Sequence, residues 1–228
     1  MAFFQIGKPR ALSDIAVSFL PSRKTRSAVP IALIEDGEFG YLESLRDNGY
    51  ALTKYDDIRD TRMVADYPVV VCDIMGVGRS LSTKFQGAHV ISELRKTYPD
   101  KFLIVYSAAT FDPSFNRFFS MADTELIKNA PLDEWVEKLD RAAQTMADPA
   151  RRWERVRNNL LLNGHLSMFQ LLKLEQAFIK AIRNKDGTSF SSKLKQLRLD
   201  DAQKEMLGVF AKSAIEIGTT LAIKGFGP

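Results

Sequence analysis

Short apolar runs separated by longer mixed segments mark residues 30–148. The runs predict strands near residues 31–34, 51–55, 69–72, 102–106 and 124–127, and the segments between and after them predict helices near 39–48, 57–65, 88–98, 113–121 and 132–147. The third and fourth runs are almost entirely apolar, which is typical of parallel strands covered on both faces. This alternation predicts an α/β fold, a parallel sheet with helices on both faces.

Beyond Asp148-Pro149 the pattern indicates helices only. One predicted apolar face comprises Trp153, Val156, Leu160 and Leu161, and a second comprises Met168, Leu171, Leu172, Phe178, Ile179 and Ile182. Their spacing of three and four residues is that of a buried helical stripe. Asp186-Gly187 breaks the chain, a short helix is expected near 190–197, and Asp200 can cap a last long helix.

Residues 1–29 precede these regions and are harder to interpret. Residues 15–20 could form a strand closed by Pro21, and residues 22–27 resemble a polar, basic linker. We expect this arm to pair with a sheet edge or with another chain. The predicted organisation is an N-terminal arm (1–29), an α/β domain (30–148) and a helical domain (149–228).

Composition restricts the class of protein. The 228 residues are 45% hydrophobic and 26% charged, enough for one large or two small globular domains. The single cysteine, Cys72, excludes an intramolecular disulfide and fits a reducing compartment. No run approaches the roughly 18 apolar residues of a membrane span, and the N-terminus does not resemble a signal peptide. We therefore expect a cytoplasmic protein that is not embedded in a membrane.

Charge is spread unevenly along the chain. Residues 1–150 carry 18 Lys and Arg against 21 Asp and Glu, a net charge of −3, whereas residues 151–228 carry 14 against 7, a net charge of +7. A basic helical region is compatible with nucleic acid, with an acidic partner, or with a simply solvated helix face.

Polar residues follow four of the apolar runs. They are the pair Glu35-Asp36, then Asp73, Ser107 and Lys128. Because the carboxyl ends of parallel strands meet at one crevice, we expect these side chains to converge. Taken alone, each has a simpler explanation as a helix cap, a turn residue or a surface charge, so the hypothesis depends on the combination.

The combination suits phosphoryl transfer to an aspartate. Carboxylates are the ligands that Mg²⁺ prefers, and Asp36 and Asp73, helped by Glu35, fit that role. Lys128 would supply a fixed cation, and Ser107 could donate a hydrogen bond to the new phosphoryl group. Gly76-Val77-Gly78 matches neither nucleotide-binding fingerprint.

These residues give the chain a resemblance to a known family. Residues 31–36 (IALIED) resemble the first strand and acidic pair of the receiver domains of bacterial two-component response regulators. Residues 71–75 (VCDIM) resemble the phosphoacceptor strand, Tyr106-Ser107-Ala108 the switch hydroxyl, and Leu126-Ile127-Lys128 the fifth strand with its lysine. The resemblance covers about half of the chain.

The resemblance implies a doubly wound, five-stranded, flavodoxin-like sheet in the order 2-1-3-4-5. It implies Asp73 as phosphoacceptor, with Lys128 and Ser107 assisting, and Mg²⁺ held by Glu35, Asp36, Asp73 and the backbone carbonyl of Met75. The phosphodonor would be a sensor histidine kinase or a phosphotransfer protein, and the chain would be a signalling protein rather than an enzyme. His165 could be a phosphodonor site of its own, although a solvated or core histidine is the simpler reading.

The function of the helical region is less constrained. We expect a protein-interaction or dimerisation module, with a homodimer or another protein as partner. Phosphorylation-controlled DNA binding is the alternative that the +7 charge leaves open, although no wing and no recognition-helix pattern is evident. A degenerate receiver that serves only as a binding scaffold is the other alternative.

The chain departs from the family in three places. Asn129, rather than proline, follows the lysine, and Glu125 occupies the position of the family's aromatic switch residue. The loop over residues 76–87 is longer than usual, and Arg79 or Lys84 in it could reach a phosphoryl group or a partner.

Overall fold

The computed structural model describes residues 9–18, 20–108, 115–163 and 166–221. The chain divides into two compact units. Residues 18–147 form one, called here the sheet unit, and residues 1–17 together with 148–228 form the other, called the helical unit. His165, the start of the helix expected near 113–121, and the chain after residue 221 lie outside the described residues.

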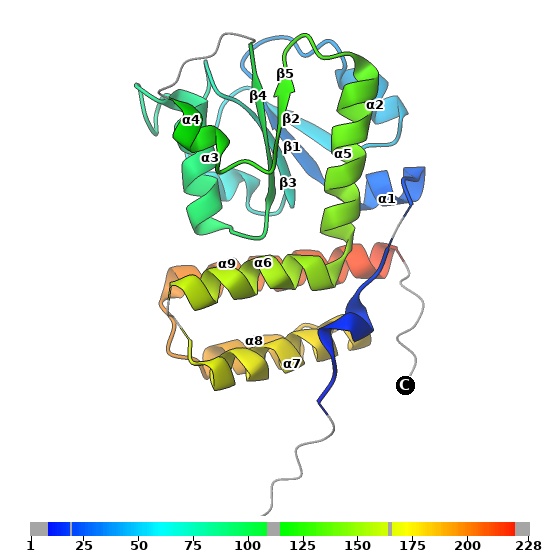
Figure 1. Cartoon of the computed structure of the whole chain (residues 1–228), viewed down its shortest axis with the longest axis vertical. Coiled ribbons are helices and arrows are strands. Elements are labelled where there is room, and N and C mark those ends of the chain that lie inside the picture. Colours follow the sequence, from blue (N-terminus) through cyan, green and yellow to red (C-terminus); the bar gives the residue numbers. More distant parts are fainter. Residues whose placement is uncertain (1–8, 19, 109–114, 164–165, 222–228) are drawn as a thin grey trace, which may run out of the picture. The chain divides into compact units, whose positions relative to one another are not determined.

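The sheet unit is built on five parallel strands, as predicted. They are β1 (Ile31–Ile34), β2 (Leu52–Tyr55), β3 (Val69–Asp73), β4 (Phe102–Ser107) and β5 (Thr124–Ile127). Their order is β2-β1-β3-β4-β5 (Figure 1). All residues of β1 and β3 are buried, which explains why these runs carry no alternating polar positions. The expected doubly wound topology is therefore confirmed.

Helices cover both faces of this sheet. In Figure 1, α3 (Gln86–Thr97) and α4 (Asn116–Phe119) lie on one side, and α2 (Leu42–Asp47) and α5 (Leu132–Ala147) on the other. The start of α5 follows Pro131, whose fixed φ suits a first helical turn. The unit also contains α1 (Arg23–Ala28) and a 3₁₀ helix, η2 (Thr61–Val64), so the longer helix expected near 57–65 is wrong.

The helical unit contains four α-helices in its described part. They are α6 (Pro149–Leu162), α7 (Met168–Asn184), α8 (Thr188–Lys195) and α9 (Asp201–Thr220). Asp200 caps α9 as predicted, since its carboxylate accepts from the Gln203 N–H at 2.7 Å. The core is aromatic: the ring of Phe178 lies 5.2 Å from Trp153 and 4.9 Å from Phe210, centroid to centroid. No described helix is long and apolar enough to cross a membrane.

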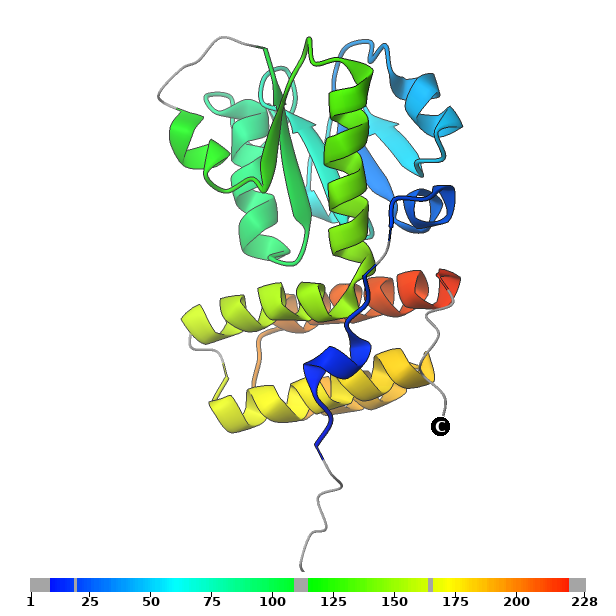
Figure 2. The ribbon, with the colours of Figure 1, turned by 45° about the vertical axis from the view of Figure 1, so that its right-hand side comes forward.

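The N-terminal arm differs from the expectation. Leu12–Ile15 form a 3₁₀ helix, η1, where a strand was expected to begin, and η1 packs on α6 and α7 (Figure 2). Ile15 is fully buried there, so contact with helices rather than a sheet edge satisfies its apolar side chain. The basic segment expected to be a linker is largely α1, because the Ser22 hydroxyl accepts from the Thr25 N–H and starts a helix.

Part of the predicted apolar stripe of the helical region is not buried. Leu171, Phe178, Ile179 and Ile182 face the core as expected. Met168 and Leu172 are exposed instead, and Leu161 is 39% exposed. The spacing of apolar residues shows which face of a helix is apolar, but it does not show how far along the helix a neighbouring element covers that face.

Candidate functional site

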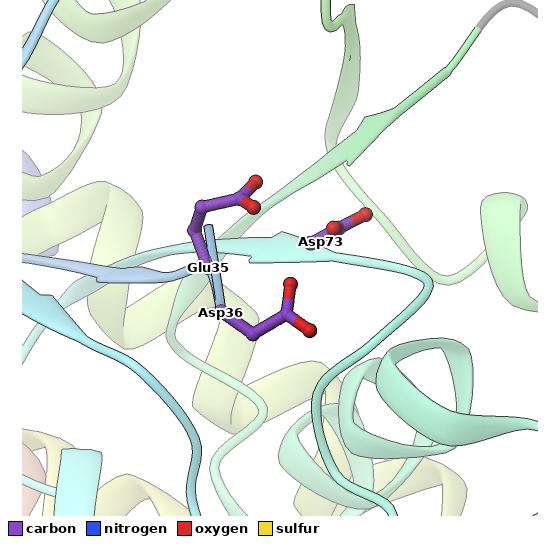
Figure 3. A group of neighbouring side chains, drawn as sticks. All are labelled: Glu35, Asp36 and Asp73. Carbon is purple, nitrogen blue, oxygen red and sulfur yellow. The ribbon is translucent and has the colours of Figure 1, made fainter. Parts of the chain in front are cut away.

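The predicted site residues emerge at one edge of the sheet. Glu35 and Asp36 directly follow β1, and Asp73 is the last residue of β3. Ser107 ends β4, and Lys128 directly follows β5. Because these strands are parallel neighbours, their carboxyl ends share one edge, and Figure 3 shows the three carboxylates turned toward a common space.

Lys128 joins the two buried carboxylates. Its Nζ donates to Asp73 Oδ2 at 2.6 Å and lies 3.2 Å from Glu35 Oε2. Asp73 is only 1% exposed and Glu35 3%. Burial of two carboxylates requires a compensating cation, and Lys128 provides it.

The pKa values in this cluster follow from burial and charge. Burial raises the pKa of Asp73, and hydrogen bonds from Lys128 and from the Met75 N–H only partly offset that effect. For Lys128, burial alone would lower the pKa, but the hydrogen bond and charge of Asp73, together with Glu35, raise it. Lys128 is therefore a fixed cation at neutral pH, and the ionised form of Asp73 is costly without a further positive charge.

The three carboxylates fit a hard divalent cation. Glu35, Asp36 and Asp73 each offer an oxygen atom, and these atoms lie within 4.8 Å of one another. Glu35 Oε1 accepts from the Gly37 N–H at 3.0 Å and from Lys128 Nζ at 3.4 Å, whereas the buried Oε2 makes no hydrogen bond, although Lys128 Nζ lies 3.2 Å from it. A buried carboxylate oxygen that makes no hydrogen bond, beside two other carboxylates, is a suitable ligand for Mg²⁺.

Gly76 shapes the same site. Its φ of +89° is in the region that favours glycine, and an added Cβ would come within 2.4 Å of Asp36 Oδ2. The absence of a side chain at this position therefore leaves room for the Asp36 carboxylate.

The remaining predicted ligands and donors lie at the edges of the cluster. The Met75 N–H donates to Asp73 Oδ1 at 3.2 Å, which fixes the loop after β3 beside the carboxylate. The Ser107 carbonyl accepts from the Lys128 N–H at 2.7 Å, so β4 and the lysine are linked through the backbone. Two roles stay predictions: the Met75 carbonyl as a metal ligand, and the Ser107 hydroxyl as a hydrogen-bond donor to a phosphoryl oxygen.

Sequence reasoning missed an aromatic group behind the lysine. The Nζ of Lys128 lies 5.2 Å from the ring centroid of Tyr106, which in turn makes edge contacts with Phe39 and Trp135. Burial, followed by the charge of Glu35, raises the pKa of Tyr106. Cation–π contact at this distance helps to hold an ammonium group in place. Phe39, Tyr106 and Trp135 come from three separate segments of the chain, so only the folded structure shows that they form one aromatic group.

A second glycine brings α3 against the acceptor strand. A Cβ built on Gly87 would lie 1.7 Å from the Asp73 carbonyl oxygen and 2.9 Å from Val77 Cγ2. The second residue of α3 therefore packs directly on the backbone that carries the Asp73 side chain. No sequence pattern pointed to this residue.

The long loop after β3 is held at both ends. The Gly76 N–H donates to Gln86 Oε1 at 2.6 Å, and the Gly78 N–H donates to Asp57. Arg79 and Lys84 are exposed, and Lys84 lies over the Phe85 ring. Their contact with a phosphoryl group or a partner stays a prediction. Glu125, the residue compared above with an aromatic position of receiver domains, is exposed on β5.

Comparisons with known proteins were made with both sequence and structure. No family model and no curated protein matches the sequence. Solved structures similar to this chain include a CheY-like response regulator receiver domain from Methanospirillum hungatei JF-1. That match has 17% identity and a TM-score of 0.39, and it covers 50% of this chain and 95% of the other.

Two further similar structures are those of NtrX and of another response regulator protein. NtrX from Brucella abortus, solved with ATP, shares 16% identity at a TM-score of 0.42, and the match covers 68% of this chain and 35% of NtrX. A response regulator from Burkholderia pseudomallei, with a phosphorylated aspartic acid, calcium and citrate, shares 16% identity at a TM-score of 0.39. That match covers 78% of this chain and 97% of the other. The fold assignment rests on the chain's own strand order, which is the flavodoxin-like order found in both flavodoxin and CheY, together with the helices that follow it.

Proposed function

We propose that the sheet unit accepts a phosphoryl group on Asp73 and that the helical unit is the module whose interactions this modification controls. The observation that carries the proposal is the contact between the buried Asp73 carboxylate and Lys128, 2.6 Å apart, beside the carboxylates of Glu35 and Asp36. A nucleophilic carboxylate with a fixed cation and a set of hard ligands is the equipment for phosphoryl transfer.

The chemistry follows from these groups. An Asp73 carboxylate oxygen attacks the phosphorus of a phosphohistidine on a kinase or a phosphotransfer protein. The P–N bond breaks, the imidazole nitrogen keeps the electron pair and is protonated, and an acyl phosphate forms on Asp73. Lys128 offsets the charge of the phosphoryl oxygens, which is electrostatic rather than covalent help. Mg²⁺, when held by Glu35, Asp36, Asp73 and the Met75 carbonyl, would supply further positive charge.

The switch would begin at the end of β4. The Ser107 hydroxyl would donate to a phosphoryl oxygen, and a movement of Ser107 would be felt at Lys128 through their backbone hydrogen bond. A local charge would thereby change the surface next to the site. The chain would be a signalling protein of the cytoplasm that changes state when it is phosphorylated, rather than an enzyme with turnover. Its helical unit would bind another protein or a second copy of the chain.

Intact-mass spectrometry tests the proposal. The full chain is incubated with Mg²⁺ and acetyl phosphate, as are Asp73→Asn and, as a matched control, Asp56→Asn, which removes an exposed carboxylate just beyond β2. We expect one added phosphoryl group in the wild type and in the control, and none in Asp73→Asn. Equal labelling of all three chains would refute Asp73 as the acceptor.

Phosphorylation-controlled DNA binding is the second candidate, because residues 151–228 carry a net charge of +7. Binding that uses several phosphate contacts should weaken by orders of magnitude between low and moderate salt. A gel shift with duplex DNA across salt concentrations, with and without acetyl phosphate, separates this candidate from a protein-interaction module. A chain that folds and binds Mg²⁺ but is never phosphorylated would instead be a binding scaffold.

A further inference from the structure

Exposed apolar side chains gather where α6 ends and α7 begins. The described residues include nine large apolar side chains that are exposed, and five of them lie within residues 161–172. These five, called here the apolar face, are Leu161, Leu162, Met168, Phe169 and Leu172. Leu162 is 86% exposed and Phe169 60%. Single exposed apolar residues are ordinary, but a cluster of this kind marks an interaction surface.

The five residues come from two successive helix ends. Leu161 and Leu162 are in the last turn of α6, and Met168 is the first residue of α7. Phe169 and Leu172 are three residues apart, which places them on the same side of α7. The helices α6 and α7 pack against each other, and Figure 2 shows the end of α6 and the start of α7 at the same end of the helical unit.

The same side of α7 already holds a peptide segment. Gln176 follows Leu172 by four residues, about 6 Å along the helix. Its side-chain amide pairs with both backbone groups of Arg10: the Arg10 N–H donates to Oε1 at 2.9 Å, and Nε2 donates to the Arg10 carbonyl at 2.8 Å. A few residues further on, Ile15 of the arm is fully buried where η1 meets α6 and α7. The apolar face therefore continues a surface that binds a segment through backbone groups and an apolar anchor.

Charge restricts what fits this surface. Residues 155–174 contain three Arg and Lys; Glu154 and Glu175 flank them, and Arg157 lies 3.6 Å from Glu175, so Lys173 is the cation that matters for the apolar face. The Nζ of Lys173 lies 3.9 Å from the ring centroid of Phe169, so a cation borders the apolar face directly. Lys180 is exposed further along α7. A second copy that packed its Phe169 on this one would bring the two Lys173 ammonium groups together, whereas a carboxylate of a partner would be attracted to Lys173.

We propose that the apolar face binds an acidic, amphipathic peptide segment of a partner protein. An apolar anchor of that segment would contact Phe169 and Leu172, and a carboxylate would pair with Lys173. Peptide recognition by an apolar surface bordered by charge is a recurring mode of binding. The inference deepens the proposed function, on which it rests, by giving the helical module its contact surface and its class of partner.

A peptide titration tests the inference without any phosphorylation step, so it can fail while Asp73 is still an acceptor. The probe is a fluorescently labelled amphipathic peptide with Leu and Phe on one helical face and Glu on the other, and the reference peptide carries Lys in place of Glu. Anisotropy is measured with the full chain, with Phe169→Ser and with Lys173→Glu. Leu20→Ser is the matched control, because Leu20 is an exposed leucine of the sheet unit.

We expect the acidic peptide to bind at least tenfold more tightly than the basic one, and Phe169→Ser and Lys173→Glu each to weaken that binding about tenfold, with no effect of Leu20→Ser. Leu172→Ser repeats the test if Phe169→Ser does not fold. Equal binding of both peptides, or no effect of the substitutions, would overturn the inference. Three other results would also overturn it. One is a dimer in light scattering that Phe169→Ser abolishes, and another is peptide binding that appears only after deletion of residues 1–8. The third is binding to anionic vesicles without binding to the peptide.

Discussion

Replacement of Gly87 by alanine tests the contact between α3 and the acceptor strand. A Cβ at this position would lie 1.7 Å from the Asp73 carbonyl oxygen, whereas ordinary van der Waals contact begins at 3.4 Å. The backbone of β3 and the start of α3 would therefore have to separate by about 1.7 Å. Neither element can yield easily, because Asp73 and Gly87 are both buried.

The expected loss of stability follows from that displacement. Overpacking of a filled core costs about 1–3 kcal/mol, and a clash with backbone rather than with a mobile side chain belongs near 3 kcal/mol. Because the displaced carbonyl belongs to Asp73 itself, the carboxylate would also shift. A misplacement of about 1 Å costs about a hundredfold in rate. We expect Gly87→Ala to lower both the free energy of unfolding and the rate of labelling.

Urea unfolding followed by circular dichroism measures the first effect, and the time course of labelling by acetyl phosphate measures the second. Gly208→Ala is the matched control, since Gly208 is also a glycine within an α-helix and an added Cβ there meets nothing within 4 Å. It should stabilise the chain by about 0.5–1 kcal/mol, as alanine does in a helix interior. Wild-type stability together with wild-type labelling in Gly87→Ala would refute the close contact and the reasoning built on it.

Three further predictions concern the charged cluster. Burial raises the pKa of Asp73, so the folded chain holds the carboxyl proton of Asp73 more tightly than the unfolded chain does. The free energy of unfolding therefore falls as the pH rises from the unfolded pKa, about 3.9, through the higher pKa of the folded chain. Asp73→Asn removes this loss and should stabilise the metal-free chain at pH 7 but not below pH 4; thermal melts that show no such pH dependence would contradict it. Mg²⁺ should raise the melting temperature of the wild type, and that of Asp36→Asn much less, because a ligand stabilises only the state that binds it; equal shifts would remove Asp36 from the site. Lys128→Met should slow labelling by about a hundredfold while Mg²⁺ still raises the melting temperature, since the lysine offsets transferred charge rather than binding metal; unchanged labelling kinetics would argue against that role.

The sheet was predictable because its signals are local. The runs at 31–34 and 69–72 are apolar in every position and buried in every position. Parallel strands then carry the residues that follow them to one edge, which is why Glu35, Asp73 and Lys128 could be placed together from the sequence. Strand order came from the resemblance to receiver domains rather than from the pattern.

Other features were beyond the sequence because they depend on contacts between distant segments. Ile15 resembled the start of a strand, yet it is buried by α6 and α7, more than a hundred residues away. Leu172 fits a buried stripe by its spacing but is exposed, because nothing among the described residues covers that turn of α7. Gly87 and Tyr106 act through their positions next to Asp73 and Lys128, which neither composition nor spacing encodes.

Localisation of the modified residue tests the central claim most directly. The chain is labelled with acetyl phosphate and Mg²⁺, the acyl phosphate is reduced with borohydride, and the digest is sequenced by mass spectrometry. An acyl phosphate on an aspartate is reduced to homoserine, so the account predicts homoserine at position 73 and aspartate at positions 36 and 57. Homoserine at another position, or aspartate retained at position 73 in a chain that gained a phosphoryl group, would contradict it.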